Sequence, residues 1–340
     1  MDIFALTRAL IDLDSTTGRE QAVTDFLAAE LSRMATHWNG RVERMQAAPG
    51  RENVFASFGE PVVTLSTHMD TVPPYFASRE DEEFIHGRGA CDAKGIIASM
   101  VAAAESLLES GARDFGLLFV VGEERDSAGA LAAAKAPRGS RYLINGEPTE
   151  NFLALGSKGA LRYELIAKGK LAHSAYPELG HSAIHALLET LEDIRAMDLP
   201  HDSVLGESTL NVGTIRGGRA PNVVADEAAA EIMFRLVSDP PAIRAGVARA
   251  AAAHGVEARE VLFARAMRFP PLEGFLTSVV AFTTDIPSFD GTWGQPFLIG
   301  PGSIHVAHTA EERVAKKDLL DAARIYAQLV RRLVANGTAP

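Results

Sequence analysis

Several features common in secreted and membrane proteins are missing from this chain. Cys91 is the only cysteine among 340 residues, so no disulfide forms within the chain and a disulfide-stabilised secreted scaffold is excluded. The opening MDIFALTRALIDLD carries acids early, whereas a signal peptide has a basic start and an unbroken apolar stretch. No apolar run reaches the ~18 residues that span a bilayer. We therefore expect a cytoplasmic protein with no membrane partner.

Basic residues are also scarce. The 33 lysines and arginines are outnumbered by 44 acids, which gives a net charge of −11. Such a surface repels phosphate backbones, and no basic stripe with interleaved aromatic residues is present in the sequence. The glycine-rich Gly87-Arg88-Gly89 lacks the Gly-Lys-Ser/Thr ending of a nucleotide-binding loop. We therefore expect neither a nucleic acid nor a nucleotide as partner.

Material for a hydrophobic core is ample. Hydrophobic residues make up 47% of the chain and charged residues 23%, values typical of a globular protein. A chain of 340 residues exceeds one comfortable core, and it fits one large domain or two.

The first part of the chain alternates between helical and strand patterns. Helices are predicted at residues 2–13, 93–110 and 127–136, and strands at residues 41–46, 53–58, 62–65, 115–121 and 141–144. Residues 17–20, Thr-Gly-Arg-Glu, fit a capping box that opens a further helix. Unbroken apolar strands such as 115–121 are typical of a parallel sheet that is buried on both faces. The alternation predicts an α/β fold with a mixed, mainly parallel sheet.

The middle of the chain has a different order. Strands are predicted at residues 159–168, 208–215, 223–236 and 256–263, with helices at 181–197 and 240–253. This βαββαβ order is the ferredoxin-like split motif. We predict that residues 156–267 form an inserted domain, and that residues 1–155 and 268–340 together form the α/β domain. The closing segment is expected to add a strand at 296–299 and a helix at about 314–335.

Polar residues follow three of the predicted strands at the point where each strand ends. His68 and Asp70 end the first of these strands, Glu123 and Glu124 the second, and Glu147 the third. In open α/β sheets the ligand site lies beyond the carboxyl ends of the strands. Adjacent carboxylates repel each other unless a cation lies between them. We therefore expect these side chains to meet at one site that binds a cation.

Each motif also has a plainer interpretation when it is taken alone. His68-x-Asp70 can be a half-buried histidine beside a capping acid instead of a metal ligand with its orienting carboxylate. Asp92 can cap the helix that follows it. His308 lies in a loop before the final helix, and His305 is a competing ligand in the same loop. Single motifs do not separate these alternatives.

Together the candidates form a set with clear metal chemistry. The combined imidazole and carboxylate ligands suit zinc, cobalt or manganese, and they are His68, Asp92, Glu124, Glu147 and His308. Five ligands are one too many for a single open catalytic site. They are the right number for two divalent ions that share one carboxylate, the arrangement of two-metal hydrolases.

At this point the sequence resembles a known family, the co-catalytic zinc aminoacylases and carboxypeptidases. That family includes acetylornithine deacetylase, succinyl-diaminopimelate desuccinylase, glutamate carboxypeptidase and tripeptidase T. The resemblance runs nearly end to end and is specific because its motifs occur in order. They are STHMDTVP at 66–73, GRGACDAKG at 87–95, GEE at 122–124, GEPT at 146–149, AHSAYP at 172–177 and GPGSIHVAHTAEE at 300–312. One departure is the stretch between Asp70 and Asp92, which is short for the family and normally helps to wall the pocket.

The resemblance implies a division of labour among the ligands. His68 and Glu147 would bind the first metal, Glu124 and His308 the second, and Asp92 would bridge the two ions. The register of the motif favours His308 over His305.

The resemblance also implies roles around the metals. Asp70 would orient His68. Glu123 would be the general base, which takes a proton from the water that bridges the two metals and gives it to the leaving amine. His173 matches a histidine that reaches the partner subunit's site and donates to the oxyanion. The resemblance places Asn222 and Arg235 at substrate-contacting positions, where a guanidinium suits an α-carboxylate. The backbone at Gly302 would approach the substrate.

These implications lead to a functional expectation. We expect a zinc-peptidase-like catalytic domain with a lid and dimerisation domain, two divalent ions (zinc, or cobalt or manganese), and a homodimer formed through the lid. The reaction would be hydrolysis of the amide bond in a small N-acyl amino acid, of the acetylornithine or acetyl-lysine deacetylase type. A dipeptidase or carboxypeptidase of the same family is the alternative, and a non-catalytic binding protein on the same fold is an alternative of another class.

Overall fold

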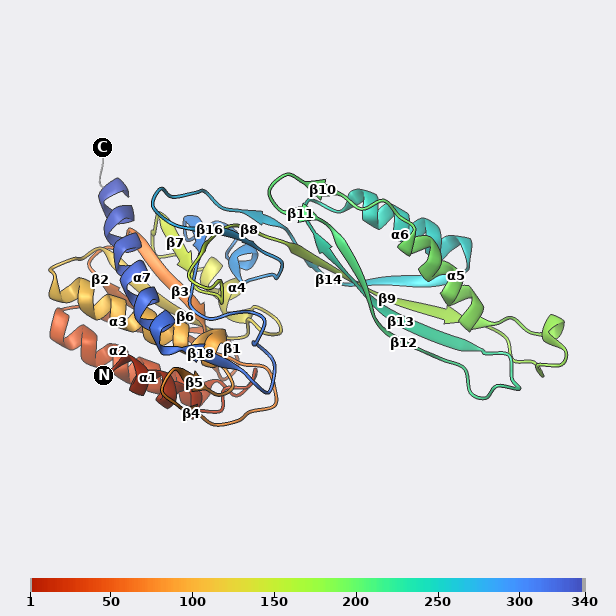
Figure 1. The fold of residues 1–340 in the computed structure, drawn as a ribbon, viewed down its shortest axis with the longest axis horizontal. Coiled ribbons are helices and arrows are strands. Elements are labelled where there is room, and N and C mark those ends of the chain that lie inside the picture. Colours follow the sequence, from red (N-terminus) through yellow and green to blue (C-terminus); the bar gives the residue numbers. More distant parts are fainter. Residues whose placement is uncertain (1, 338–340) are drawn as a thin grey trace. The chain divides into compact units, whose positions relative to one another are not determined.

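A computed structural model describes residues 2–337 of the chain. The chain divides into two compact units. The first unit comprises the residues up to Leu155, Phe269–Ser278 and the residues from Thr284 onward, and the second comprises Gly156–Arg268 and Val279–Thr283. Figure 1 shows the elements of both units along the chain.

The first unit is built on a mixed sheet. Its strand order is β1-β2-β6-β3-β7-β17, and the strands are β1 (Arg41–Ala48), β2 (Arg51–Phe58), β6 (Phe115–Val120), β3 (Val63–His68), β7 (Tyr142–Asn145) and β17 (Gln295–Leu298). β6, β3, β7 and β17 pair in parallel, whereas β1 and β2 are antiparallel additions at one edge. Every residue of β3 and of β6 is buried, as the unbroken apolar sequence of β6 predicts.

Helices cover both faces of this sheet. One face packs against α1 (Ile3–Ile11), α2 (Gln21–Trp38), α3 (Gly95–Glu109) and α7 (Lys316–Gly337), in a core that includes Leu65 and Leu117. The other face, with Leu118 and Val120, packs against α4 (Ala128–Ala134), η3 (Ile286–Phe289) and Trp293. Alternate residues of β6 thus serve two cores, which is the period of a strand. The predicted α/β class with a mainly parallel sheet is confirmed.

Several short strands were not predicted from the sequence. β4 (Arg79–Glu80), β5 (Phe84–His86) and β18 (Arg313–Ala315) form a small sheet in the first unit, ordered β18-β5-β4. β8 (Leu153–Ser157), β15 (Met267–Arg268) and β16 (Thr277–Val280) form another. Strands of two to five residues are too short to display a reliable alternating pattern, so these strands depend on the partners that tertiary structure supplies.

The second unit contains the βαββαβ order that the sequence predicts. Its elements are β9 (Gly159–Lys168), α5 (Ala183–Arg195), β12 (Thr209–Gly217), β13 (Glu227–Leu236), α6 (Pro241–Ala253) and β14 (Val256–Ala264), with η2 (Pro177–Leu179) and the hairpin β10 (His201–Asp202)–β11 (Gly206–Glu207) in its connections. The sheet order is β12-β13-β9-β14, with antiparallel pairing throughout.

The two faces of this second sheet differ. One face packs on α5 and α6 through side chains such as Leu161, Leu165 and Phe234. The alternate residues of β9 and β13 point to the face that these helices do not cover, and they include Arg162, Glu164 and Arg235. Charged side chains therefore lie on the uncovered face of the second unit's sheet, among apolar ones such as Ile166 and Met233.

The predicted capping box at residues 17–20 is wrong. α2 begins at Gln21, and Glu20 occupies its N-cap without a capping hydrogen bond from its side chain. The Thr17 hydroxyl instead donates to Asp70 Oδ2 at 2.7 Å, and the Glu20 carboxylate accepts from Arg51 and from the Gly18 amide. The two side chains that a capping box requires, Thr17 and Glu20, therefore bind Asp70 and Arg51, which are distant in the sequence.

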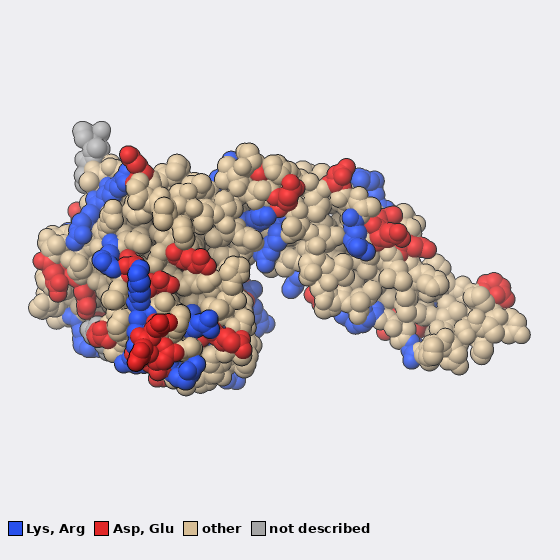
Figure 2. Space-filling model, viewed as in Figure 1, with Lys and Arg blue, Asp and Glu red and all other residues tan. Residues whose placement is uncertain are grey.

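No helix within residues 2–337 has both the length and the apolar character needed to cross a membrane. Figure 2 shows acidic and basic side chains interspersed over the visible face of each unit.

Candidate metal centre

The polar strand ends converge as predicted. β3 lies between β6 and β7 in the sheet, and His68 at the end of β3 pairs in register with Val120 at the end of β6. The Gly122-Glu123-Glu124 turn follows β6 directly, and Glu147 follows β7. Because the three strands run in parallel, their carboxyl ends meet at one edge, and the site residues follow from that topology.

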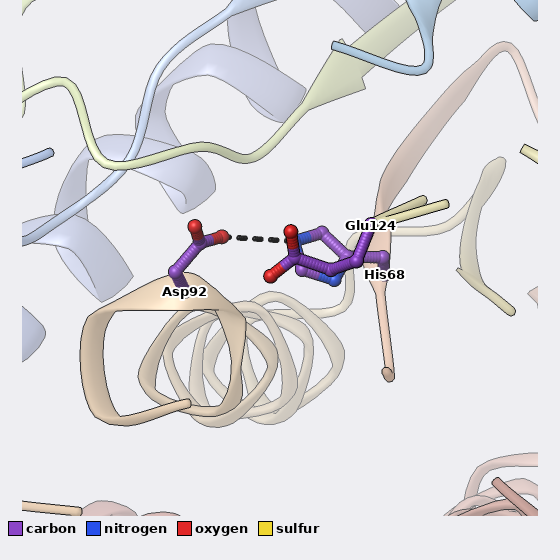
Figure 3. Close-up of side chains that lie close together, drawn as sticks. All are labelled: His68, Asp92 and Glu124. Atoms are coloured by element: carbon purple, nitrogen blue, oxygen red, sulfur yellow. Dashed lines mark hydrogen bonds and ion pairs between the residues drawn. The ribbon is translucent and has the colours of Figure 1, made fainter. Parts of the chain in front are cut away.

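Three candidate ligands form a tight group, shown in Figure 3. One ligand atom from each of His68, Asp92 and Glu124 lies within 4.8 Å of the other two. His68 Nε2 is 2.9 Å from Asp92 Oδ1. Asp92 projects from the short helical turn η1 (Ala90–Lys94), which leads into α3 (Figure 3). The helix start that was predicted at residue 93 is therefore a distinct turn that presents a carboxylate, and α3 begins at Gly95.

His308 joins this group from the loop before β18. Its Nε2 lies 3.0 Å from Glu124 Oε1 and 3.3 Å from Asp92 Oδ2. These hydrogen bonds, first to Asp92 and then to Glu124, raise the pKa of His308 to about 10. His305 is exposed, and its backbone amide is bound by the Ser303 hydroxyl at 3.4 Å. The geometry therefore favours His308, in agreement with the register of the motif.

Asp70 is buried and organises the turn that carries Glu123 and Glu124. Its carboxylate accepts hydrogen bonds from the amides of Gly122 at 2.9 Å, Glu123 at 3.0 Å and Glu124 at 3.3 Å. His68 Nδ1 lies 3.0 Å from the backbone carbonyl of Asp70 and 3.6 Å from Asp70 Oδ1. Asp70 thus reaches both the imidazole and the Gly122–Glu124 turn, and its backbone carbonyl is the nearer partner of the ring.

Glu123 and Glu147 lie outside the tight group but within its electrostatic field. Burial, followed by the charge of Glu147, raises the pKa of Glu123 well above its usual value. Burial also raises the pKa of Glu147, and Asp92 and Glu124 raise it further. Buried carboxylates that repel one another in this way are stabilised when cations are placed among them. The donor set of two imidazoles and several carboxylates fits divalent zinc, cobalt or manganese.

Asp285 is a neighbouring acid that sequence reasoning missed. It is 1% exposed, and the Ser127 side chain only partly offsets the cost of burying its carboxylate. Burial raises the pKa of Asp285 to about 7, and its charge in turn raises the pKa of Glu123 and of Glu147. Thr284-Asp285 stands in a segment without a recognisable pattern, so no signal in a single sequence identifies it.

Glu312 and Arg88 form a second feature that was missed, although both lie in motifs that were noted. Arg88 Nη1 donates to Glu312 Oε2 at 2.6 Å, and the two residues are 2% and 1% exposed. Glu312 Oε1 accepts from the amides of Gly89 at 2.9 Å and Asp92 at 3.3 Å. The pair therefore fastens the loop that carries Asp92 to the segment that carries His308.

Cys91 behaves as a buried thiol. It is fully buried, and its Sγ lies 3.7 Å from both the Ser303 carbonyl and Glu312 Oε1. Burial, and then the charge of Glu312, raises the pKa of Cys91 well above its usual value. A thiol held in its neutral form is a poor nucleophile. Gly302 lies against it with a φ of 83°, and a Cβ at this position would meet Cys91 Cβ at 2.6 Å.

The remaining predicted residues lie in the second unit. His173 and Asn222 are exposed on two loops that meet through a bridge between His173 and Val223 and a hydrogen bond from the Ser174 amide to the Asn222 carbonyl at 3.0 Å. Arg235 lies on β13, on the sheet face that the helices do not cover. Within residues 2–337 no acidic partner influences Arg235, and burial alone lowers the pKa of its guanidinium.

The pKa of His308 leads to a prediction about metal loading. Its pKa of about 10 means that the His308 imidazole, paired with Asp92 and Glu124, is protonated at neutral pH. A histidine that binds a metal ion must be neutral. Zinc binding to chelator-treated protein at pH 7 is therefore expected to release a proton from His308, and zinc affinity should rise with pH. Calorimetry in two buffers with different ionisation enthalpies measures this release. His308→Ala should release about one proton fewer, whereas equal heats in both buffers for the unaltered protein would contradict the prediction.

Comparison with known proteins agrees with this geometry. The profile of peptidase family M20/M25/M40 matches residues 64–332. A peptidase M20 domain-containing protein of Schizosaccharomyces pombe is 36% identical over 343 residues, which cover 97% of this chain and 84% of the relative. A probable carboxypeptidase of Aspergillus niger is 37% identical over 368 residues, which cover 96% of this chain and 88% of the relative.

A solved structure supports the fold. The M20 family metallo-carboxypeptidase of Sulfolobus solfataricus has a TM-score of 0.79 to this chain at 16% identity, and the match covers 98% of this chain and 99% of that one. The resemblance drawn from the motifs is thereby confirmed at the level of the family. The chain belongs to peptidase family M20/M25/M40 and is a hydrolase of peptide or amide bonds.

Proposed function

We propose that this protein is a two-metal hydrolase that releases an amino acid with a free α-carboxylate, as a carboxypeptidase or dipeptidase does. His68 and Glu147 would hold one divalent ion, Glu124 and His308 the other, and Asp92 would bridge them. Support comes from the clustering of His68, Asp92, Glu124 and His308, and from the family to which the chain belongs. Zinc is the expected metal, and cobalt and manganese suit the same donors.

The chain's own residues would divide the chemistry around these ions. When bound, two divalent ions polarise the amide carbonyl and lower the pKa of water so that a nucleophile is available at neutral pH. Glu123 would take the proton from the attacking water and give it to the departing nitrogen. Its raised pKa suits a group that must both accept and donate a proton near neutrality. Asp70 would hold Glu123 in place through the backbone of the Gly122–Glu124 turn.

The environment of Arg235 is the observation that supports this choice of substrate. Among the described residues no acid pairs with the partly buried guanidinium of Arg235, so it lacks the counter-charge that buried cations normally have. Its planar donors suit a carboxylate, which they can bind through both oxygens. A substrate's α-carboxylate would supply the missing charge, and the amide next to that carboxylate would be the one cleaved. The name of the Aspergillus niger relative, a probable carboxypeptidase, points in the same direction.

A deacetylase of the acetylornithine or acetyl-lysine type is the second candidate. An N-acetyl amino acid presents the same α-carboxylate beside the same kind of amide, so Arg235 suits it equally. The two candidates differ in the acyl side of the scissile bond, where an amino-acid residue replaces an acetyl group.

The second unit would act as the lid and dimerisation domain. Its β12 is an edge strand with an almost fully exposed face, an arrangement that pairs readily with a second copy of itself. His173, on an exposed loop, would then reach the partner's site and donate to the oxyanion, with Asn222 beside it and the Gly302 backbone contacting substrate. A monomeric mass by sedimentation equilibrium across the working concentration range would count against this arrangement.

Hydrolysis of a panel of dipeptides and N-acetyl amino acids tests the proposed function. We expect zinc- or cobalt-loaded protein to cleave members with a free α-carboxylate, and a chelator to abolish cleavage. Cleavage of dipeptides supports the carboxypeptidase or dipeptidase assignment, and cleavage of N-acetyl amino acids alone transfers it to the deacetylase. Cleavage that persists after verified removal of metal would refute the two-metal proposal.

A further inference from the structure

A second guanidinium lies beside Arg235 on the same face of the second unit's sheet. In the β9–β13 register Arg162 is opposite Met233, and Arg235 is opposite Ala160. Arg162 and Arg235 are therefore diagonal neighbours that project to one face, where Cβ atoms are about 7 Å apart and long side chains reach each other. This face is the one that α5 and α6 do not cover.

The Arg162 side chain, like that of Arg235, is partly buried. Its Nε is buried and has no hydrogen-bond partner within residues 2–337. A buried donor without a partner costs about 1–3 kcal/mol, and more when the group is charged. Folding alone gives no reason for Arg162 to be left in this condition beside a second partly buried arginine.

Other arginines on the same sheet are treated differently. Arg216 and Arg259 both pair with Glu164, at 3.7 Å and 3.4 Å. Glu164 follows Arg162 by two residues on β9, so it lies on the same face of the sheet. It pairs with Arg216 and Arg259, whereas Arg235 lies beyond Arg162 in the opposite direction along β9. The face thus has one part where Arg216 and Arg259 pair with Glu164. In the other part neither Arg162 nor Arg235 forms an ion pair among the described residues, although Glu231 lies diagonal to Arg162 on β13.

Because neither guanidinium is held by an acid within residues 2–337, an anion from outside the protein can supply the counter-charge. One carboxylate satisfies one planar guanidinium through both of its oxygens. Two neighbouring guanidiniums therefore match a ligand with two carboxylates better than a ligand with one.

We infer that Arg162 and Arg235 together form a subsite for a dicarboxylic amino acid, so that the preferred leaving residue is aspartate or glutamate. The inference rests on the proposed function for the role of Arg235, which binds the α-carboxylate. Arg162 adds the specificity, because it binds the side-chain carboxylate of the same residue. A neutral isostere in this subsite leaves Arg162 unpaired, so asparagine and glutamine residues are rejected.

Matched substrates test this inference directly. Alanyl-glutamate and alanyl-glutamine differ only in the second carboxylate, as do N-acetylglutamate and N-acetylglutamine. For the metal-loaded protein we expect kcat/KM to be higher for the glutamate member of the cleaved pair by about tenfold or more. Equal values, or a preference for glutamine, would overturn the inference even though hydrolysis itself is observed.

Two variants assign the carboxylates. Arg162→Gln should lose far more activity on the glutamate substrate than on the glutamine substrate, so the ratio falls towards one, and Arg162→Lys should restore part of it. Arg235→Gln should lower kcat/KM for both the glutamate and the glutamine substrate. Arg259→Gln is the matched control on the same sheet and should leave the ratio unchanged. If Arg162→Gln weakens both substrates equally, Arg162 shares the α-carboxylate and the dicarboxylate subsite is wrong.

A binding measurement separates this inference from the proposed function. N-acetylglutamate and N-acetylglutamine are titrated into metal-loaded Glu123→Gln protein, in which turnover is blocked. Tighter binding of the glutamate compound that is lost in the added Arg162→Gln variant supports the subsite even if no peptide or acyl amino acid is ever cleaved. Equal binding of both compounds would overturn it.

Discussion

Replacing Glu123 by glutamine is expected to lower kcat by about 10³-fold, within the range that general acid–base catalysis contributes. Glutamine has the size of glutamate but cannot take a proton from water or return one to the leaving nitrogen. Glu123 lies outside the group formed by His68, Asp92 and Glu124, so the variant should still bind two metal ions per chain. Steady-state kinetics and metal analysis of the same preparation measure both quantities.

Glu311→Gln is the matched control for this experiment. Glu311 is an exposed acid in the motif that also holds His308, and its substitution removes the same charge without touching the strand ends. We expect kcat to be unchanged. A Glu123→Gln variant that is fully active with full metal content would show that another group is the base. Asp285, which is buried close enough to influence Glu123, would then be the first to substitute.

The parts of this site that sequence reasoning found have a common cause. Glu147 and the Glu123-Glu124 pair each follow an apolar strand directly, and His68 ends another. A run of apolar residues predicts a buried parallel strand, and the topology of the fold brings the carboxyl ends of such strands to one edge of the sheet. The sequence alone therefore groups residues from three strand ends that are far apart in the chain, namely His68, Asp70, Glu123, Glu124 and Glu147. The motifs then added Asp92 and His308, which the structure brings to within hydrogen-bond distance of this edge.

The parts that were missed depend on pairings that leave no local trace. Arg88 and Glu312 are separated by most of the chain, and nothing in a single sequence distinguishes the buried Glu312 from the exposed Glu311 beside it. Thr17 was assigned to a helix cap because its local pattern fits one, yet its hydroxyl binds Asp70. Arg162 reads as one polar residue in an alternating strand, and its significance appears only when the register places it beside Arg235.

Disrupting the Arg88–Glu312 pair should affect both stability and the metal site. Glu312→Ala leaves the Arg88 guanidinium buried without its counter-charge, a change that typically costs about 3–5 kcal/mol and corresponds to a drop in Tm of roughly 10 °C. It also frees the amides of Gly89 and Asp92, so the Asp92 carboxylate, the proposed bridging ligand, loses its support. Outer partners of metal ligands are typically worth about 10–100-fold in metal affinity. Thermal unfolding and zinc titration measure the two effects, with Glu311→Gln as the control.

A double variant distinguishes a positioning role from a merely stabilising one. Arg88→Leu combined with Glu312→Leu removes both charges and fills the space with apolar atoms, a replacement that is often neutral or favourable for stability. We expect Tm to recover relative to Glu312→Ala, whereas zinc affinity and kcat/KM stay low because leucine cannot accept the amide hydrogen bonds of Gly89 and Asp92. Recovery of all three quantities together would mean that the ion pair only stabilises the fold. Recovery of stability alone would show that Glu312 holds the Asp92 loop in the geometry that a two-metal site requires.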